Sequence, residues 1–150
     1  MIIKITPDNQ VIIEKFPQGT IREQNTQLRS FIGNGSTLYK YVIPRKLYSL
    51  LDGHMNSHGT VSMLMDEDGL FNDELDVNKV ASWLYESDVY ECPIMGNVLI
   101  VGEKHTADGY IFCDIPENIA ESLKSKLEQI ALDAQKNLEQ TKTHKKSKSL

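Results

Sequence analysis

The chain has 150 residues, a net charge of −5, 40% hydrophobic and 25% charged residues, which is typical of a soluble globular protein. This length suffices for one domain whose core needs no disulfide or metal. The sequence contains no run of about 18 apolar residues, which excludes a transmembrane helix, and its N-terminal segment lacks the pattern of a signal peptide.

Charge indicates which partners to expect, and cysteine content indicates the cellular compartment. Residues 1–118 carry 17 acidic and nine basic side chains, whereas residues 119–150 carry four acidic and seven basic ones. An acidic body repels nucleic acid, so nucleic-acid binding is not expected. Cys92 and Cys113 form no CxxC pair. Without a secretory signal, they predict reduced thiols in a cytoplasmic protein.

The first half of the chain predicts strands and short helices. "MIIKI" and "QVIIEKF" flank a Pro-Asp-Asn turn and predict a β-hairpin. Thr20 is the expected N-cap of a helix that "GNG" ends at residues 33–35. "TLYKYVI" predicts a strand, a short helix is expected from Pro44 to Gly53, and "GTVSMLM" predicts a central strand.

The second half predicts a short helix, two strands and a long helix. "DVNKVASWLYES" predicts a helix with Val80, Trp83 and Leu84 turned inward. The segments "NVLIVGE" and "GYIFCDI" predict a strand pair. A long C-terminal helix is indicated by a sustained apolar stripe, formed by Ile119, Leu123, Leu127, Ile130, Ala134 and Leu138.

Together these elements predict an α+β fold with a mainly antiparallel sheet of about five to six strands, short helices and a long C-terminal amphipathic helix. We expect an α+β domain over residues 1–115, the amphipathic helix over 116–140 and a disordered basic tail over 141–150. The 3/4 spacing of the stripe also resembles a coiled-coil seam, so Leu123, Leu127 and Ile130 are candidates for self-association into a homo-oligomer.

The most unusual stretch is acidic. Six carboxylates fall between positions 66 and 76, namely Asp66, Glu67, Asp68, Asp73, Glu74 and Asp76. An EF-hand with Gly69 at its sixth position would need ligands at Leu64 and Leu75, which excludes that motif. The remaining interpretations are a solvated turn, weak cation binding, or a negative surface for a partner protein.

Patterns for catalysis and cofactors are weak. His54 and His58 lie in a glycine-rich segment without the glutamate of a metalloprotease motif. No nucleophile elbow or phosphate-binding glycine loop is present. We therefore expect no enzyme activity, no metal and no cofactor. Aromatic and basic residues suggest a possible nucleotide-binding face, formed by Tyr39, Tyr41, Arg45 and Lys46, although half-buried tyrosines of a sheet would give the same pattern.

Residues 1–104 resemble a small domain family found mainly in bacteriophages, plasmids and the bacteria that carry them. The likeness rests on "MDEDG", on Asn78 followed by Ala81 and Ser82, on "PIMGN" before an apolar strand, and on "LRSFIGNGSTLYKYVI" upstream. The chain departs from the family pattern by Asp68 before Gly69 and by its acidic "FNDE".

The resemblance carries no reaction to transfer, but it implies a biological setting. Accessory proteins of mobile elements act in the host cytoplasm, where they often block a host factor or sequester a nucleotide. The expected function is a non-catalytic phage-type protein that binds and modulates or inhibits a host protein, including a counter-defence role. The alternative is a protein that binds or sequesters a small nucleotide.

Overall fold

The β-branched N-terminal segments form a hairpin, as predicted. β1 (Ile2–Ile5) and β2 (Val11–Glu14) pair antiparallel with Ile5 opposite Val11. In the turn between them, the Asn9 N–H donates to the Thr6 carbonyl oxygen at 3.0 Å.

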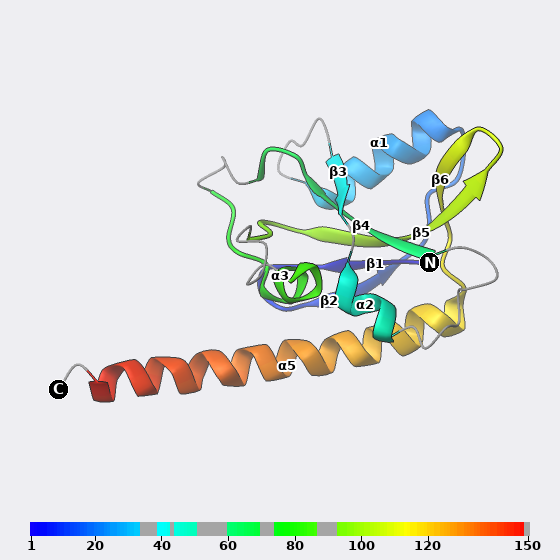
Figure 1. The fold of residues 1–150 in the computed structure, drawn as a ribbon. Helices are drawn as coiled ribbons and strands as arrows, with labels where there is room; N and C mark the ends of the chain where they lie inside the picture. Colours follow the sequence, from blue (N-terminus) through cyan, green and yellow to red (C-terminus); the bar gives the residue numbers. More distant parts are fainter. Residues whose placement is uncertain (34–38, 43, 51–59, 70–73, 87–92, 149–150) are drawn as a thin grey trace.

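This computed structural model describes residues 1–33, 39–42, 44–50, 60–69, 74–86 and 93–148 (Figure 1).

The described strands build one antiparallel sheet in the order β2-β1-β5-β4-β3, with β6 paired to β5. β5 (Val98–Thr106) is the central strand, since it pairs with β1, with β4 (Thr60–Asp66) and with β6 (Gly109–Cys113). β3 (Tyr39–Val42) is the edge strand beside β4. The predicted α+β fold with a mainly antiparallel sheet is confirmed.

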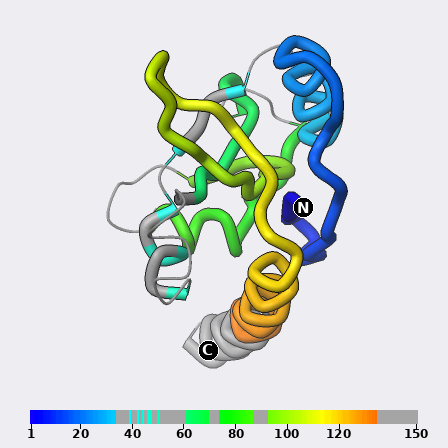
Figure 2. The backbone as a smooth tube through the Cα atoms, turned by 90° about the vertical axis from the view of Figure 1, so that its right-hand side faces the viewer, coloured from blue at the N-terminus to red at the C-terminus, as the bar shows by residue number. Residues whose placement is uncertain are grey.

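Both faces of the sheet are covered by helices, as Figures 1 and 2 show. One face packs Leu64, Leu99 and Val101 against α1 (Ile21–Ile32). The other face carries the larger apolar cluster and is covered by three helices, which are α2 (Arg45–Leu50), α3 (Lys79–Tyr85) and α5 (Glu117–Lys148). Strand alternation explains the division, because neighbouring residues point to opposite faces.

The ends of α1 follow the sequence signals. The Thr20 hydroxyl oxygen accepts the Glu23 N–H at 3.1 Å, and Gly33 closes the helix with its N–H on the Arg29 carbonyl oxygen at 3.0 Å. Gly33 has φ 78°, a conformation in which glycine carries no Cβ penalty.

The long helix α5 is part of the core. Ala120, Leu123, Leu127 and Ala131 are buried in the cluster beneath the sheet, and Ile130 is half-buried against it. The sequence placed a boundary at residue 116, but the first turns of α5 share the core of the residues that precede it. The helical backbone of α5 is described to Lys148, and the disordered tail expected over residues 141–150 stays a prediction.

In the helices that cover this face, Leu123, Leu127 and Trp83 have other surroundings than the sequence predicted. Leu123 and Leu127 are 1% and 0% exposed, so they bury their side chains within their own chain and offer no surface to a second copy. Trp83 is 41% exposed instead of turned inward, and the Lys46 ammonium lies 4.5 Å from its ring centroid. The buried stripe of α3 consists of Val80, Ala81 and Leu84.

Candidate partner-binding site

The acidic segment begins where β4 ends. Asp66 is only 8% exposed, and its Oδ1 accepts the Asp68 N–H at 2.9 Å. This bond turns the chain immediately after the strand. Gly69 is buried against Met95, whose Cβ would lie 3.5 Å from a Cβ at position 69. The start of the segment is therefore fixed to the sheet end, and Asp66 serves the turn instead of a partner, contrary to its predicted role.

A second anchor holds the other end of the segment. The Gly96 N–H donates to the Asp76 carbonyl oxygen at 2.9 Å, and Val77 forms a β-bridge with Met95. Leu75 is 8% exposed and packs over Gly96. Both anchors thus use the turn that leads into β5.

Between and beside these anchors, Glu67, Asp68, Glu74 and Asp76 are exposed. Within the described part of the chain, Glu67, Asp68 and Asp76 form no ion pair. Asp73 lies outside the described residues. At Glu67, Asp68 and Asp76, the segment therefore presents negative charge that no described residue neutralises in an ion pair, and its backbone is held at both ends.

The structure gives no support to a metal centre in the part of the chain that it describes. No group of three His, Cys, Asp or Glu side chains there could hold an ion. His54, His58 and Cys92 lie outside the described residues, and Cys113 is a half-buried free thiol. Burial raises the pKa of the Cys113 thiol, which disfavours the reactive thiolate.

Asn78 and Ser82 turn out to be structural. Asn78 is fully buried, and its amide nitrogen donates to the carbonyl oxygens of Ile5 at 2.9 Å and Gly96 at 2.8 Å. Its Oδ1 accepts the Ala81 N–H at 3.1 Å and caps α3. The Ser82 hydroxyl oxygen accepts the Ile94 N–H at 3.0 Å. These bonds hold α3 to the end of β1 and to residues 94–96 before β5.

Of the four predicted nucleotide-binding residues, the two whose side chains are described do not lie together. Tyr39 packs on the α1 face near Phe112, with its hydroxyl donating to Asn25 Oδ1 at 2.7 Å. Lys46 belongs to α2 on the opposite face, beside Trp83. The side chains of Tyr41 and Arg45 lie outside the described part. The sheet therefore separates the two predicted residues whose side chains are described.

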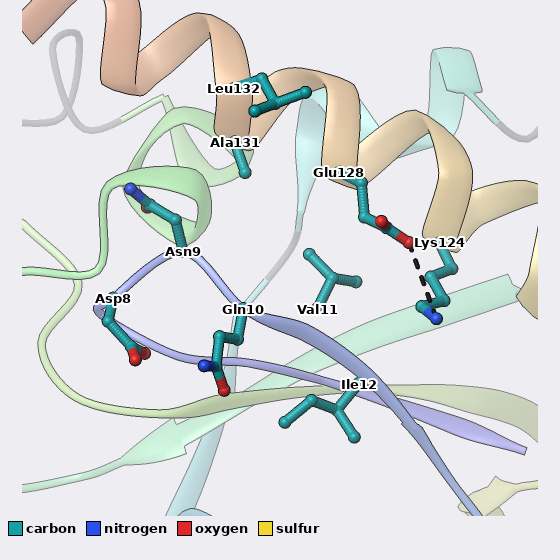
Figure 3. A pocket seen from close by; sticks show the side chains of 9 residues that line it. All are labelled: Asp8, Asn9, Gln10, Val11, Ile12, Lys124, Glu128, Ala131 and Leu132. Atoms are coloured by element: carbon teal, nitrogen blue, oxygen red, sulfur yellow. Dashed lines mark ion pairs between the residues drawn. The ribbon is translucent and has the colours of Figure 1, made fainter.

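A groove that the sequence did not reveal lies between β2 and α5 (Figure 3). It has a volume of about 410 Å³ and is lined by Asp8, Asn9, Gln10, Val11 and Ile12 on one side and by Lys124, Glu128, Ala131 and Leu132 on the other. Figure 3 shows the Lys124–Glu128 ion pair on its helical wall. The sequence pattern predicted that residues 8–12 form a turn and the start of a strand, but it did not predict that α5 lies beside them.

Comparison of the chain with protein-family models, with curated protein sequences and with solved structures gave no match. The resemblance to the phage and plasmid family therefore stays a prediction. Among the described helices, none combines the length and the apolar character needed to cross a bilayer.

Proposed function

We propose that the chain is a non-catalytic accessory protein of phage or mobile-element type, which binds and modulates or inhibits a host protein in the cytoplasm. The observation that carries the proposal is the anchored acidic segment, in which Glu67, Asp68 and Asp76 are exposed and have no ion-pair partner among the residues that the structure describes. A counter-defence role is the biological setting that the family resemblance implies.

The chemistry of this surface favours a basic protein partner. Complementary charge increases the rate of encounter and selects among partners. A segment held at Asp66 and at Asp76 has both ends in place before a partner arrives, so binding costs it less conformational entropy than it costs a loop with free ends. Nucleic acid is a poor partner for the same surface, since phosphates repel carboxylates.

The nucleotide-binding alternative has less support, because Tyr39 and Lys46 lie on opposite faces of the sheet. A nucleotide site would have to use other residues than the set that the sequence suggested.

The test compares two variants that each remove three negative charges. One neutralises the acidic segment by Glu67→Gln, Asp68→Asn and Asp76→Asn. The matched control neutralises exposed acids elsewhere by Asp108→Asn, Glu121→Gln and Asp133→Asn. Each protein is expressed in the natural host, purified at low salt and weighed by native mass spectrometry, with the partner identified from its peptides.

We expect the wild-type protein and the control to retain one host protein in stoichiometric amount, and the acidic-segment variant to bind it at least about tenfold more weakly, which corresponds to about 1.4 kcal/mol. Raising the salt concentration should weaken the wild-type complex. Retention of the same complex by the acidic-segment variant, or equal loss in the control, would contradict the proposal.

A further inference from the structure

The outer edge of β2 is free in the described structure. Among the described strands, β2 ends the strand order and pairs only with β1. The Thr6 N–H donates to the Gln10 carbonyl oxygen at 3.0 Å, and the register continues as Lys4 opposite Ile12. Because hydrogen-bonded and non-hydrogen-bonded pairs alternate in antiparallel strands, the N–H and C=O groups of Val11 and Ile13 point away from β1. The outward-pointing backbone groups of such an edge are a template for another strand.

The groove of Figure 3 lies beside this strand, between residues 8–12 and α5. Its floor and walls contain apolar side chains from both elements, among them Val11, Ile12 and Leu132. Leu132 is 52% exposed, although it follows directly after the buried Ala131. An added strand would therefore find backbone partners at the edge and apolar contacts from α5.

Asn9 provides an independent sign of a missing partner. It lines the groove, adopts φ 66° and has a buried Oδ1 without a hydrogen-bond partner among the described residues. An acceptor that is removed from water and unpaired is unfavourable by about 1–3 kcal/mol. A donor that arrives with an added strand would relieve this penalty.

We propose that the strand added at this edge is β2 of a second copy of the chain, antiparallel and with Val11 opposite Ile13 of the other copy. The two-fold axis then passes through the pair formed by the two Ile12 residues. Gln10 lies opposite Glu14, and the pairing directs Lys15, which follows β2 and is exposed in the single chain, toward the turn that contains Asn9. The Lys15 ammonium of the second copy is thus the donor that we assign to Asn9 Oδ1, which has no hydrogen-bond partner among the described residues.

Complementarity selects this register. Only residues whose backbone groups point outward can exchange hydrogen bonds, so the register changes in steps of two. Moving two positions along would set Val11 opposite Lys15 and Ile12 opposite Glu14, which places charge against apolar side chains. In the proposed register apolar residues meet apolar residues, and no like charges lie opposite each other.

The second copy fits better than an unrelated peptide because the edge is complementary to itself at five successive positions, from Gln10 to Glu14. Directly opposite residues share a face of the sheet, so the pairing makes one continuous sheet with both copies of α5 on the same face. Such an isologous contact closes on itself and forms a dimer instead of a fibre. It is independent of the acidic segment proposed for the host partner.

The experiment is a measurement of molar mass by light scattering for the wild-type chain, Ile12→Glu, Ile12→Lys and an equimolar mixture of these two variants. Ile111→Glu is the matched control. Ile12 faces Lys4 and Ile111 faces Lys104 on the neighbouring strand, so either glutamate meets a lysine within its own chain.

We expect twice the chain mass of 17.0 kDa for the wild type and for Ile111→Glu. Each Ile12 variant alone should be reduced to a single chain, because like charges meet at the axis. The mixture should return to the doubled mass, because opposite charges then meet. A wild-type monomer, a dimer that survives both Ile12 variants, or a mixture that stays monomeric would overturn the proposal.

A cross-linking measurement covers the case in which the charged variants unfold. In a Cys92→Ser, Cys113→Ser background, Ile12→Cys should oxidise to a covalent dimer, since opposite residues of a non-hydrogen-bonded pair have Cα atoms about 4.5 Å apart. Gln18→Cys, which is exposed beyond the strand, is the control. Equal cross-linking at positions 12 and 18 would overturn the assignment to the β2 edge, as would capture of a foreign strand there in place of a second copy.

Discussion

The buried amide of Asn78 joins three parts of the chain that are far apart in sequence. Its nitrogen bonds to Ile5 at the end of β1 and to Gly96 before β5, while its oxygen caps α3. Short polar side chains are favoured as N-caps, which is a local property. The contacts with Ile5 and Gly96 are a tertiary property of the same side chain.

Asn78→Ala should lower the free energy of unfolding by about 3 kcal/mol, because it removes a helix cap and the hydrogen bonds to two buried carbonyl oxygens. Urea denaturation measures this change. Asn97→Ala is the control, since the half-buried Asn97 makes one described side-chain bond, to the Ile32 carbonyl oxygen at 3.2 Å; we expect a loss of about 1 kcal/mol there. Equal losses for the two variants would contradict the central role of Asn78.

Tyr39 should make stability sensitive to alkaline pH. Burial raises the pKa of its phenol, and the nearby Arg29 guanidinium opposes this shift in part. The pKa is then higher in the folded than in the unfolded chain. The neutral phenol contributes stability that is fully present below about pH 10, its unfolded pKa, and that is lost as the pH rises through the folded pKa.

Tyr39→Phe removes both this dependence and the hydrogen bond to Asn25. We expect the variant to be about 1 kcal/mol less stable at neutral pH and to lose less stability than the wild type at alkaline pH. Urea midpoints measured across this pH range give both quantities. Wild-type and variant curves that stay parallel would show that Tyr39 does not titrate with folding.

At the scale of elements, α5 contains leucines with opposite environments. Leu127 is 0% exposed and Leu132 is 52% exposed. Leu127→Ala should lower the free energy of unfolding by about 3 kcal/mol through lost burial and a cavity. Leu132→Ala should change it by less than about 0.5 kcal/mol under monomeric conditions. Thermal or urea denaturation distinguishes them, and similar losses would mean that α5 packs differently.

The acidic segment shows how neighbouring elements determine the use of a charged residue. Asp66 and Asp68 are two positions apart, but Asp66 terminates β4 and is buried by its surroundings, whereas Asp68 is exposed. Their order in the sequence did not distinguish the carboxylate that makes the turn from the one that faces solvent.

For the whole molecule, the sheet order predicts a gradient of local stability. β5 pairs with β1, β4 and β6, and Val98–Val101 is buried from both faces. Beyond Gly102, His105 and Tyr110 are exposed in the β5–β6 hairpin. Hydrogen exchange read by mass spectrometry should be slowest at residues 98–101 and at least about a hundredfold faster at residues 105–110. Uniform protection along β5 would contradict this gradient.

Much of the architecture follows from the sequence alone, because it depends on local signals. β-branched runs gave the hairpin, Thr20 and Gly33 gave the ends of α1, and the 3/4 stripe gave α5. Apolar residues between glycines likewise predicted the strand at Val98–Val101. Each of these patterns reflects the preference of a short segment in any surroundings.

The tertiary structure alone decided how those segments meet. The apolar stripe of α5 has the same spacing whether it faces a second helix or its own sheet, and only the fold placed Leu123 and Leu127 in the core. Likewise, the sheet separated Tyr39 from Lys46, and the order of its strands left β2 at an edge beside α5. Periodicity records which residues avoid water, but the contact that removes them from water depends on residues distant in the chain.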